Sequence, residues 1–172
     1  MEKDMKDLLL KAQSGDCDAF GEIYSLYAKQ LYLYALKYLG NTYDAEDAVS
    51  ECVIKVFKSV KSIKSPEKVK AYFFKALSNT AKTMLSQNSL KLVDELDENV
   101  KSEECLEDRM LLSYDIQNAL KTISEEEKTI VLLSAVGGFN SKEISKIIDI
   151  PAVTVRSKLS RAFLKLRKEI EK

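Results

Sequence analysis

A group of hydroxyl-bearing and basic side chains near the C-terminus has the composition needed to bind nucleic acid. It comprises Thr154, Arg156, Ser157, Lys158 and Arg161. An arginine can donate two hydrogen bonds to a guanine edge, while serine and threonine can bond to a base or a phosphate. If this segment is helical, Thr154, Ser157 and Arg161 fall on one side, and the other two flank them. The chemistry that this pattern indicates is hydrogen bonding to DNA bases and phosphates.

An ordinary amphipathic helix with solvated charges would show a similar face. The residues before this helix distinguish such a helix from a DNA-binding one. Such a helix is expected from about Ala152 to Ile170, and its apolar stripe comprises Val155, Leu159, Ala162, Phe163, Leu166 and Ile170. Ser141 can cap a short helix upstream, and residues 149–151 make a tight turn. A short helix, a tight turn and a longer helix predict a helix-turn-helix, whose second helix can enter the major groove.

A second basic stretch lies between Lys55 and Lys82, with eight lysines and a single acid, Glu67. The 172-residue chain has 27 basic and 27 acidic side chains, and this net charge of zero would by itself argue against nucleic acid. The acids are concentrated elsewhere, because residues 87–114 carry eight acidic and three basic side chains. Two basic surfaces are therefore concealed by one acidic segment.

Catalysis and metal binding are not expected from this composition. The chain has no histidine, which is the commonest general base and metal ligand. Cys17, Cys52 and Cys105 form no CxxC pair, and Cys52 lies among apolar positions typical of a buried thiol. We expect no catalytic residue, no metal and no cofactor. Because no apolar run approaches the ~20 residues of a membrane span and the N-terminus lacks a signal-peptide pattern, we expect a cytoplasmic protein without membrane insertion.

The elements that position these side chains are predicted to be helices, because Gly and Pro are scarce and apolar residues recur every three or four positions. Upstream of the helix-turn-helix, we expect helices over about 4–12, 18–39, 44–60, 65–85, 109–122 and 125–136. Asp44 and Ser65 are the expected N-caps of the third and fourth helices, and Ser124 with Glu127 forms a capping box. The apolar stripe of the second helix comprises Phe20, Ile23, Tyr24, Tyr27, Leu31, Ala35 and Tyr38.

The fold class that we predict is all-α, with two small helical domains joined by an acidic linker. The first domain spans residues 1–86, the linker 87–108 and the helix-turn-helix domain 109–172. The linker is expected where the apolar periodicity degrades and acidic residues predominate.

The C-terminal segment EISKIIDIPAVTVRSKLSRA resembles region four of the sigma-70 family, particularly its extracytoplasmic-function (ECF) group. The segments DAFGEIYSLY, LYLYALKYLGNTYDAEDAVSECVIKVFKSV and KAYFFKALSNTAK independently resemble region two, in the family's order. The resemblance implies a promoter-specificity subunit of bacterial RNA polymerase, which binds core polymerase and promoter DNA and is not itself an enzyme. An anti-sigma factor is a further partner that the family allows.

The resemblance also implies roles for three sets of residues. In the family, an acidic helix docks on the largest polymerase subunit, and this acidic set maps onto Asp44, Glu46, Asp47 and Glu51. Stabilisation of a helix N-terminus is a structural alternative for the first three acids, and it accounts less readily for Glu51. The following loop and helix, which recognise and open the minus-ten element, give a minus-ten set of Lys61, Lys64, Lys68, Lys70, Tyr72, Lys75, Asn79 and Lys82. The recognition helix reads the minus-thirty-five element through a minus-thirty-five set of Thr154, Arg156, Ser157, Lys158 and Arg161.

The sequence departs from the family at the end of the minus-ten helix. Family members usually follow the asparagine with an aspartate and a cluster of arginines, whereas Lys82 is here the one charge before Lys91. This departure predicts weak phosphate contacts, and hence either an easily opened promoter set or a need for a helper. It also supports an alternative function, a sigma-like helix-turn-helix regulator or co-sigma without independent initiation activity. Tyr72, Phe73 and Phe74 can instead be core residues, and Phe73 is the best candidate.

Overall fold

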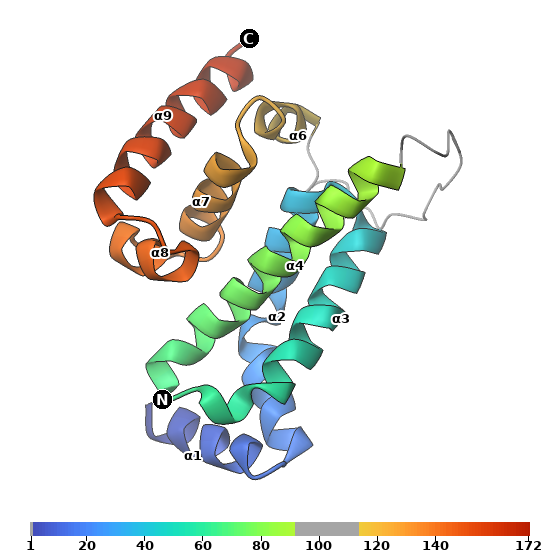
Figure 1. The fold of residues 1–172 in the computed structure, drawn as a ribbon, viewed down its shortest axis with the longest axis vertical. Helices are drawn as coiled ribbons and strands as arrows, with labels where there is room; N and C mark the ends of the chain where they lie inside the picture. Colours follow the sequence, from blue (N-terminus) through green and yellow to red (C-terminus); the bar gives the residue numbers. More distant parts are fainter. Residues whose placement is uncertain (1, 92–113) are drawn as a thin grey trace.

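The computed structural model of the protein describes residues 2–91 and 114–172, which form helices joined by short turns (Figure 1). The predicted all-α fold is confirmed, with no strand within these two ranges. The helices before residue 92 form a first unit and those after residue 113 form a second unit. Within the described ranges, no helix combines the length and hydropathy that a membrane span requires, and no acidic or cysteine cluster is suited to a metal ion.

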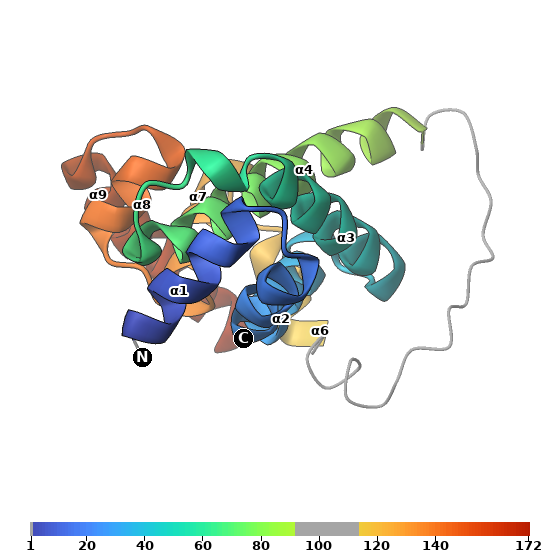
Figure 2. The ribbon, with the colours of Figure 1, turned by 90° about the horizontal axis from the view of Figure 1, so that it is seen from below.

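The first unit contains α1 (Glu2–Gln13), α2 (Cys17–Leu39), α3 (Thr42–Lys58), the 3-10 turns η1 (Val60–Ser62) and η2 (Pro66–Lys68), and α4 (Val69–Lys91). Helices α2, α3 and α4 pack together, and α1 lies across one end of this bundle (Figure 2). Gln13 fixes α1 to the connection between α3 and α4, because its side-chain amide donates to the carbonyls of Val60 and Ile63 at 3.2 and 2.9 Å.

The N-cap of α3 is Asn41, whereas the sequence pattern predicted Asp44. Asn41 has extended backbone dihedrals, and its Oδ1 accepts a hydrogen bond of 2.8 Å from the backbone N–H of Asp44. The Asp44 carboxylate instead accepts from Asn41 Nδ2 at 2.8 Å and from Asn88 Nδ2 at 3.0 Å. Asp44 therefore ties the start of α3 to the end of α4.

The fourth helix begins and ends later than expected. Ser65 precedes the 3-10 turn η2, with Pro66 at its first position, and α4 itself starts at Val69. The helix continues past Leu85 to Lys91, where the Asn88 bond holds its last turns against α3. Residues 87–91 are thus helical rather than linker. The rest of the expected linker and the first part of the helix expected over 109–122 lie outside the described residues.

The second unit contains α6 (Tyr114–Leu120), α7 (Glu125–Ala135), α8 (Ser141–Ile148) and α9 (Ala152–Ile170). The capping box predicted at Ser124 and Glu127 is present at the start of α7. The cap of α8 is Asn140 rather than Ser141. Asn140 has the extended backbone of a cap and exchanges hydrogen bonds of 2.8 and 3.0 Å with Glu143.

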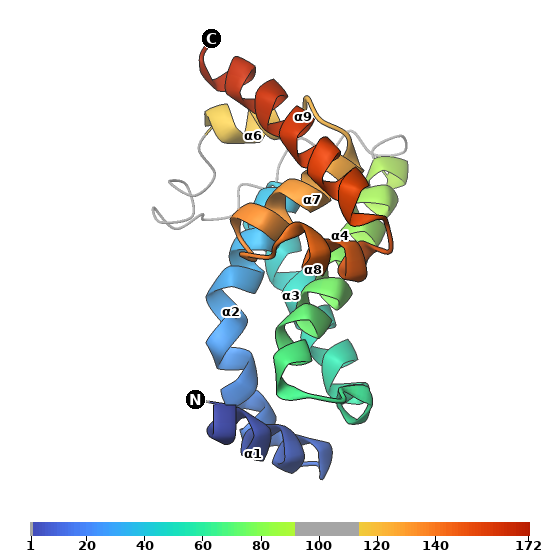
Figure 3. The same ribbon diagram turned by 90° about the vertical axis from the view of Figure 1, so that its left-hand side faces the viewer.

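The two units pack against each other along a seam, an arrangement that the sequence did not predict (Figure 3). Helix α7 lies against α2, α8 lies against α4, and one hydrophobic core extends through both units. Tyr34 is fully buried although it lies off the predicted stripe of α2, because α7 covers that side. The predicted core residues Cys52 and Phe73 are also buried, and the Cys52 thiol donates to the Phe73 carbonyl at 3.3 Å.

Candidate nucleic-acid interface

The helix-turn-helix predicted near the C-terminus is present as α8, a tight turn and α9. Asp149 adopts the left-handed conformation in the turn (φ 56°), which aspartate tolerates better than most residues. The Ser145 hydroxyl donates to the Ile150 carbonyl, and Pro151 leads into α9, where its missing N–H leaves no donor unsatisfied. These local contacts hold the recognition helix in place after α8.

The apolar stripe of α9 is only partly buried. Val155, Ala162 and Leu166 are buried. Phe163 and Ile170 retain 45% and 54% exposure, because they line an open cavity with α6 and α7 rather than a filled core. The buried part of the stripe lies beneath the residues that carry the minus-thirty-five set.

The minus-thirty-five set lies on the solvent side of α9. Arg156, Ser157 and Arg161 are exposed, while Thr154 and Lys158 are partly exposed. Arg161 Nε donates to the Ser157 carbonyl at 3.3 Å, and the Ser157 hydroxyl donates to the Thr154 carbonyl at 3.1 Å. Lys158 forms an ion pair of 2.9 Å with Glu126 of α7.

A second ion pair holds α9 on α7. Lys165 Nζ lies 2.9 Å from Oε1 of Glu127, whose side chain is largely buried. Hydrogen bonds from the backbone N–H of Ser124 and from Lys165 hold the pKa of Glu127 below its usual value. The carboxylate that caps α7 therefore also positions the recognition helix.

Most of the minus-ten set forms a stripe along η2 and α4. At the helical repeat, one face carries Lys68, Tyr72, Lys75, Asn79 and Lys82, and exposed Lys61 and Lys64 lie in the connection before η2. The Tyr72 hydroxyl lies 3.2 Å from the Ser62 hydroxyl, which places the phenol against this connection. A row of cations beside one aromatic ring can follow the phosphates of a single strand and stack a base.

Two members of the minus-ten set contact the second unit. Lys70 Nζ donates to the Gly137 carbonyl at 2.6 Å and lies 5.1 Å from the centre of the Phe139 ring. Lys75 Nζ lies 3.9 Å from the Asp149 carboxylate. Lys70 is thus on the side of α4 that packs at the seam, away from the stripe.

The acidic set on α3 divides into exposed and structural members. Glu46 and Asp47 are exposed, and exposed Glu51 pairs with Lys55 at 2.8 Å. Asp44 is partly buried, and its carboxylate accepts hydrogen bonds from the side-chain amides of Asn41 and Asn88.

Sequence reasoning missed two exposed apolar residues on the same face of α3. Tyr43 and Ile54 retain 71% and 55% exposure and share a helical face with Asp47 and Glu51. Exposed aromatic and aliphatic side chains that are bordered by charges are typical of protein interfaces. The available signal was that both residues lie off the buried stripe of α3.

Comparison with models of known protein families shows which class of helix-turn-helix protein this chain resembles. The family model of sigma-70 region 2 matches residues 23–90, and that of sigma-70 region 4 matches residues 113–166. The chain belongs to the sigma-70 family. Region 2 of this sigma factor lies in the first unit, and region 4 includes the helix-turn-helix of the second unit.

The sigma factor is similar over nearly its whole length to curated members of the ECF group. It is 25% identical to the ECF RNA polymerase sigma factor SigW of Bacillus subtilis, covering 99% of this chain and 98% of the relative. It is 29% identical to the RNA polymerase sigma factor SigV of the same organism, covering 84% of this chain and 86% of the relative. These relatives confirm the ECF assignment.

Two solved structures share the fold of this sigma factor. CnrH, in complex with the cytosolic domain of CnrY, has a TM-score of 0.74 at 16% identity and covers 98% of this chain and 97% of its own. The sigma factor RpoE, in complex with the anti-sigma factor NepR from Bartonella quintana, has a TM-score of 0.71 at 19% identity and covers 88% of this chain and 96% of its own.

Proposed function

We propose that this sigma factor directs core RNA polymerase to specific promoters and initiates transcription by recognising and opening promoter DNA. The observation that carries the proposal is the presence of two separate groups of basic and polar side chains, on α4 and α9, in a chain that matches sigma-70 regions 2 and 4. A function as a helix-turn-helix protein alone would account for the basic residues of α9, but it would not account for the lysine stripe of α4.

Each set has a role that its surroundings support. The minus-thirty-five set on exposed α9 reads bases and phosphates of duplex DNA. The stripe of the minus-ten set binds the phosphates of the opened strand, with Tyr72 as a stacking surface. Glu46, Asp47 and Glu51, with Tyr43 and Ile54, form the face that docks on core polymerase.

The chain itself performs no covalent chemistry in this function. Promoter choice follows from differential binding of DNA sequences, and the polymerase core supplies the bond-forming steps. An anti-sigma factor is a further partner in this proposal, because RpoE, which has the same fold, was solved with the anti-sigma factor NepR bound.

Run-off transcription with purified core polymerase on a genomic library tests the proposal. We expect discrete transcripts that depend on the added chain, and their start sites would identify its promoters. The absence of transcripts together with failure to retain core polymerase in a pull-down would contradict the proposal. Retention of core without transcripts would favour a co-sigma, which the uncharged stretch of α4 between Lys82 and Lys91 makes the second candidate.

A further inference from the structure

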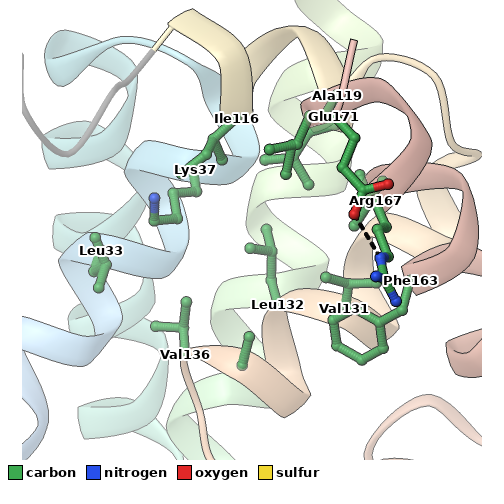
Figure 4. Close-up of a pocket in the computed structure, with 14 residues that line it drawn as sticks. Leu33, Lys37, Ile116, Ala119, Val131, Leu132, Val136, Phe163, Arg167 and Glu171 are labelled. Atoms are coloured by element: carbon green, nitrogen blue, oxygen red, sulfur yellow. Dashed lines mark hydrogen bonds and ion pairs between the residues drawn. The ribbon is translucent and has the colours of Figure 1, made fainter.

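An open cavity of about 550 Å³ lies between α2 of the first unit and helices α6, α7 and α9 of the second (Figure 4). Eleven of its fourteen lining residues are apolar, and the other three are Lys37, Arg167 and Glu171. Binding sites for small molecules combine a mostly apolar lining of this kind with a few polar groups. The composition of the cavity is therefore that of a site for a largely apolar ligand.

The side chains around the cavity leave it unfilled. Ala119 of α6 and Ala135 of α7 are small residues at positions where larger ones would occupy the space. Ile116, Phe163 and Ile170 line the cavity and still retain 38%, 45% and 54% exposure. Apolar side chains gathered around a hollow stay in water and lose the dispersion contacts of a filled core. An apolar occupant would remove both costs.

The size of the cavity limits the class of ligand. An engineered protein cavity of about 150 Å³ with leucine, isoleucine and phenylalanine walls takes up one benzene molecule. At about 550 Å³, the cavity beside α9 has room for a chain of roughly ten or more carbon atoms. Its lining has no polar side chain besides the three charged ones, so it does not suit a sugar or a nucleoside. An unbranched aliphatic chain needs no hydrogen-bond partner and can enter through the open side.

The charged residues of the cavity indicate where an anionic group would bind. Figure 4 shows Lys37 and Arg167 on opposite sides of the apolar side chains. Arg167 Nε is already paired with Glu171 Oε1 at 2.7 Å. Lys37 lies in the last turn of α2 and is half-buried, and burial lowers the pKa of its ammonium. Because attraction between opposite charges is stronger where water is partly excluded, Lys37 is the better partner for a carboxylate.

We propose that this cavity binds a free fatty acid, with its hydrocarbon chain among α2, α6, α7 and α9 and its carboxylate at Lys37. One negative charge at the end of an unbranched chain matches one cation at the edge of an apolar hollow. The site goes beyond the proposed function and does not rest on it. The helical repeat places Phe163 and Ile170 on the side of α9 away from Ser157 and Arg161, so a bound fatty acid leaves the minus-thirty-five set accessible.

Isothermal titration calorimetry on the full-length chain tests the apolar part of the site. The probes are octanoate, decanoate and dodecanoate, each below its micelle-forming concentration. We expect one molecule to bind per chain, with an affinity that rises by about fourfold for each added methylene. Affinities that do not depend on chain length, or several molecules bound per chain, would overturn the proposal.

The neutral analogue decanol tests the role of Lys37. Lys37→Gln should weaken the binding of decanoate by about tenfold, because the ligand loses a charged hydrogen-bond donor, and should leave the binding of decanol unchanged. The matched control Lys29→Gln makes the same change at an exposed position of α2 outside the cavity and should alter neither affinity. Equal losses for decanoate and decanol would remove Lys37 from head-group recognition.

A cavity-filling substitution tests the location. Ala135→Phe should reduce decanoate affinity by about tenfold or more, because the ring occupies the space of several methylenes. Ala28→Phe adds the same ring at a partly exposed position of α2 that does not line the cavity, and it should bind decanoate like wild type. If circular dichroism shows that Ala135→Phe is unfolded, Leu33→Phe enters the cavity from the opposite helix. Wild-type affinity in a folded cavity variant would overturn the site.

Two other occupants of the same hollow give different results. If a membrane surface covers it, the chain will sediment with phosphatidylglycerol vesicles and will not bind decanoate. If a second copy covers it, sedimentation velocity will show a dimer that Ala135→Phe abolishes, again without decanoate binding. Either result would overturn the fatty-acid site, whereas saturable binding of one decanoate to a monomer supports it.

Discussion

Helices α9 and α4 carry the two sets of residues that we propose bind DNA, and they differ in how exposed those sets are. On α9, Arg156, Ser157 and Arg161 are exposed and the buried stripe faces its own unit. On α4, the stripe borders the seam, and Lys70 is bonded to Gly137 of the other unit. The minus-thirty-five surface is thus formed within one unit, whereas the minus-ten surface depends on the relation between the two.

This difference matches the state of the DNA that each helix is proposed to bind. Duplex DNA presents its major groove before any melting, so a rigid, exposed helix can read it directly. An opened strand exists only after base pairs are broken, and a surface that becomes free late is suited to it. The comparison predicts that substitutions of the exposed residues Arg156, Ser157 and Arg161 on α9 act on recognition alone, whereas those near the seam act on both binding and conformation.

The largest expected effect comes from Arg161→Ala on the exposed helix. Loss of an arginine that contacts a base should reduce discrimination for the minus-thirty-five element by roughly 1–3 kcal/mol. The measurement is competitive run-off transcription from promoters with intact and scrambled minus-thirty-five elements. Lys168→Ala, farther along α9, serves as the comparison and should weaken promoters uniformly. Unchanged discrimination by the Arg161 variant would remove this residue from base recognition.

A somewhat smaller effect is expected for Asp47→Lys on the face of α3 that is independent of the seam. Reversal of an exposed interfacial charge should lower affinity for core polymerase by about tenfold or less, mostly through slower association. Surface plasmon resonance with immobilised core measures the change, and thermal unfolding should be unaffected. Glu22→Lys on α2 makes the same reversal at another exposed position. Equal core affinities for both variants would argue against a docking role for Asp47.

A gain of function is expected for Ser86→Arg, which adds a cation in line with the stripe of α4. One extra phosphate contact should steepen the salt dependence of single-strand binding by about 0.7 in logarithmic slope. Fluorescence anisotropy over a series of salt concentrations gives this slope. Ser25→Arg on α2 adds the same charge at an exposed site outside the minus-ten set. Identical slopes for the two variants would show that the strand does not reach the end of α4.

The smallest effect concerns alkaline pH. Burial raises the pKa of Tyr38 to about 12, with Thr129 lowering it and Glu125 raising it as secondary influences. The form in which the two units are packed together favours the neutral phenol of Tyr38. The free energy that this phenol contributes to the packing is therefore complete below pH 10 and is lost as pH rises toward 12. Absorbance of tyrosinate near 295 nm should show a late-titrating tyrosine in wild type, and Phe139→Ser should move it toward pH 10. A late titration that persists in an expanded Phe139 variant would mean that α7 does not cause the burial.

Local sequence signals predicted most of the helices, because helix periodicity and capping are decided by neighbouring residues. The capping box of Ser124 and Glu127 and the turn at Asp149 are found as expected. Asn41 and Asn140 were missed as caps because each competes with a second plausible cap nearby. Which residue takes the extended backbone depends on where the preceding chain enters the helix.

The seam could not be predicted from the same signals. Each unit already has an apolar stripe that explains its own core, so nothing in the periodicity requires the units to meet. Tyr34 lies off the stripe, and it is buried between Tyr38 and Phe74 of its own unit and α7 of the other unit. Likewise, the composition around Lys70 indicated phosphate binding, and its carbonyl partner at Gly137 depends on a turn 67 residues later. Placement of units relies on a few contacts between distant residues, which sequence periodicity does not encode.

The carbonyl of Gly137 makes the contacts of Lys70 depend on ionic strength. It is a neutral dipole that satisfies the ammonium of Lys70, whereas the competing ligand on DNA is a full negative charge. Mobile ions weaken attraction to a phosphate far more than a short hydrogen bond in a half-buried site. High salt concentration therefore favours the hydrogen bond of Lys70 to Gly137, and low salt concentration favours contact of Lys70 with a DNA phosphate.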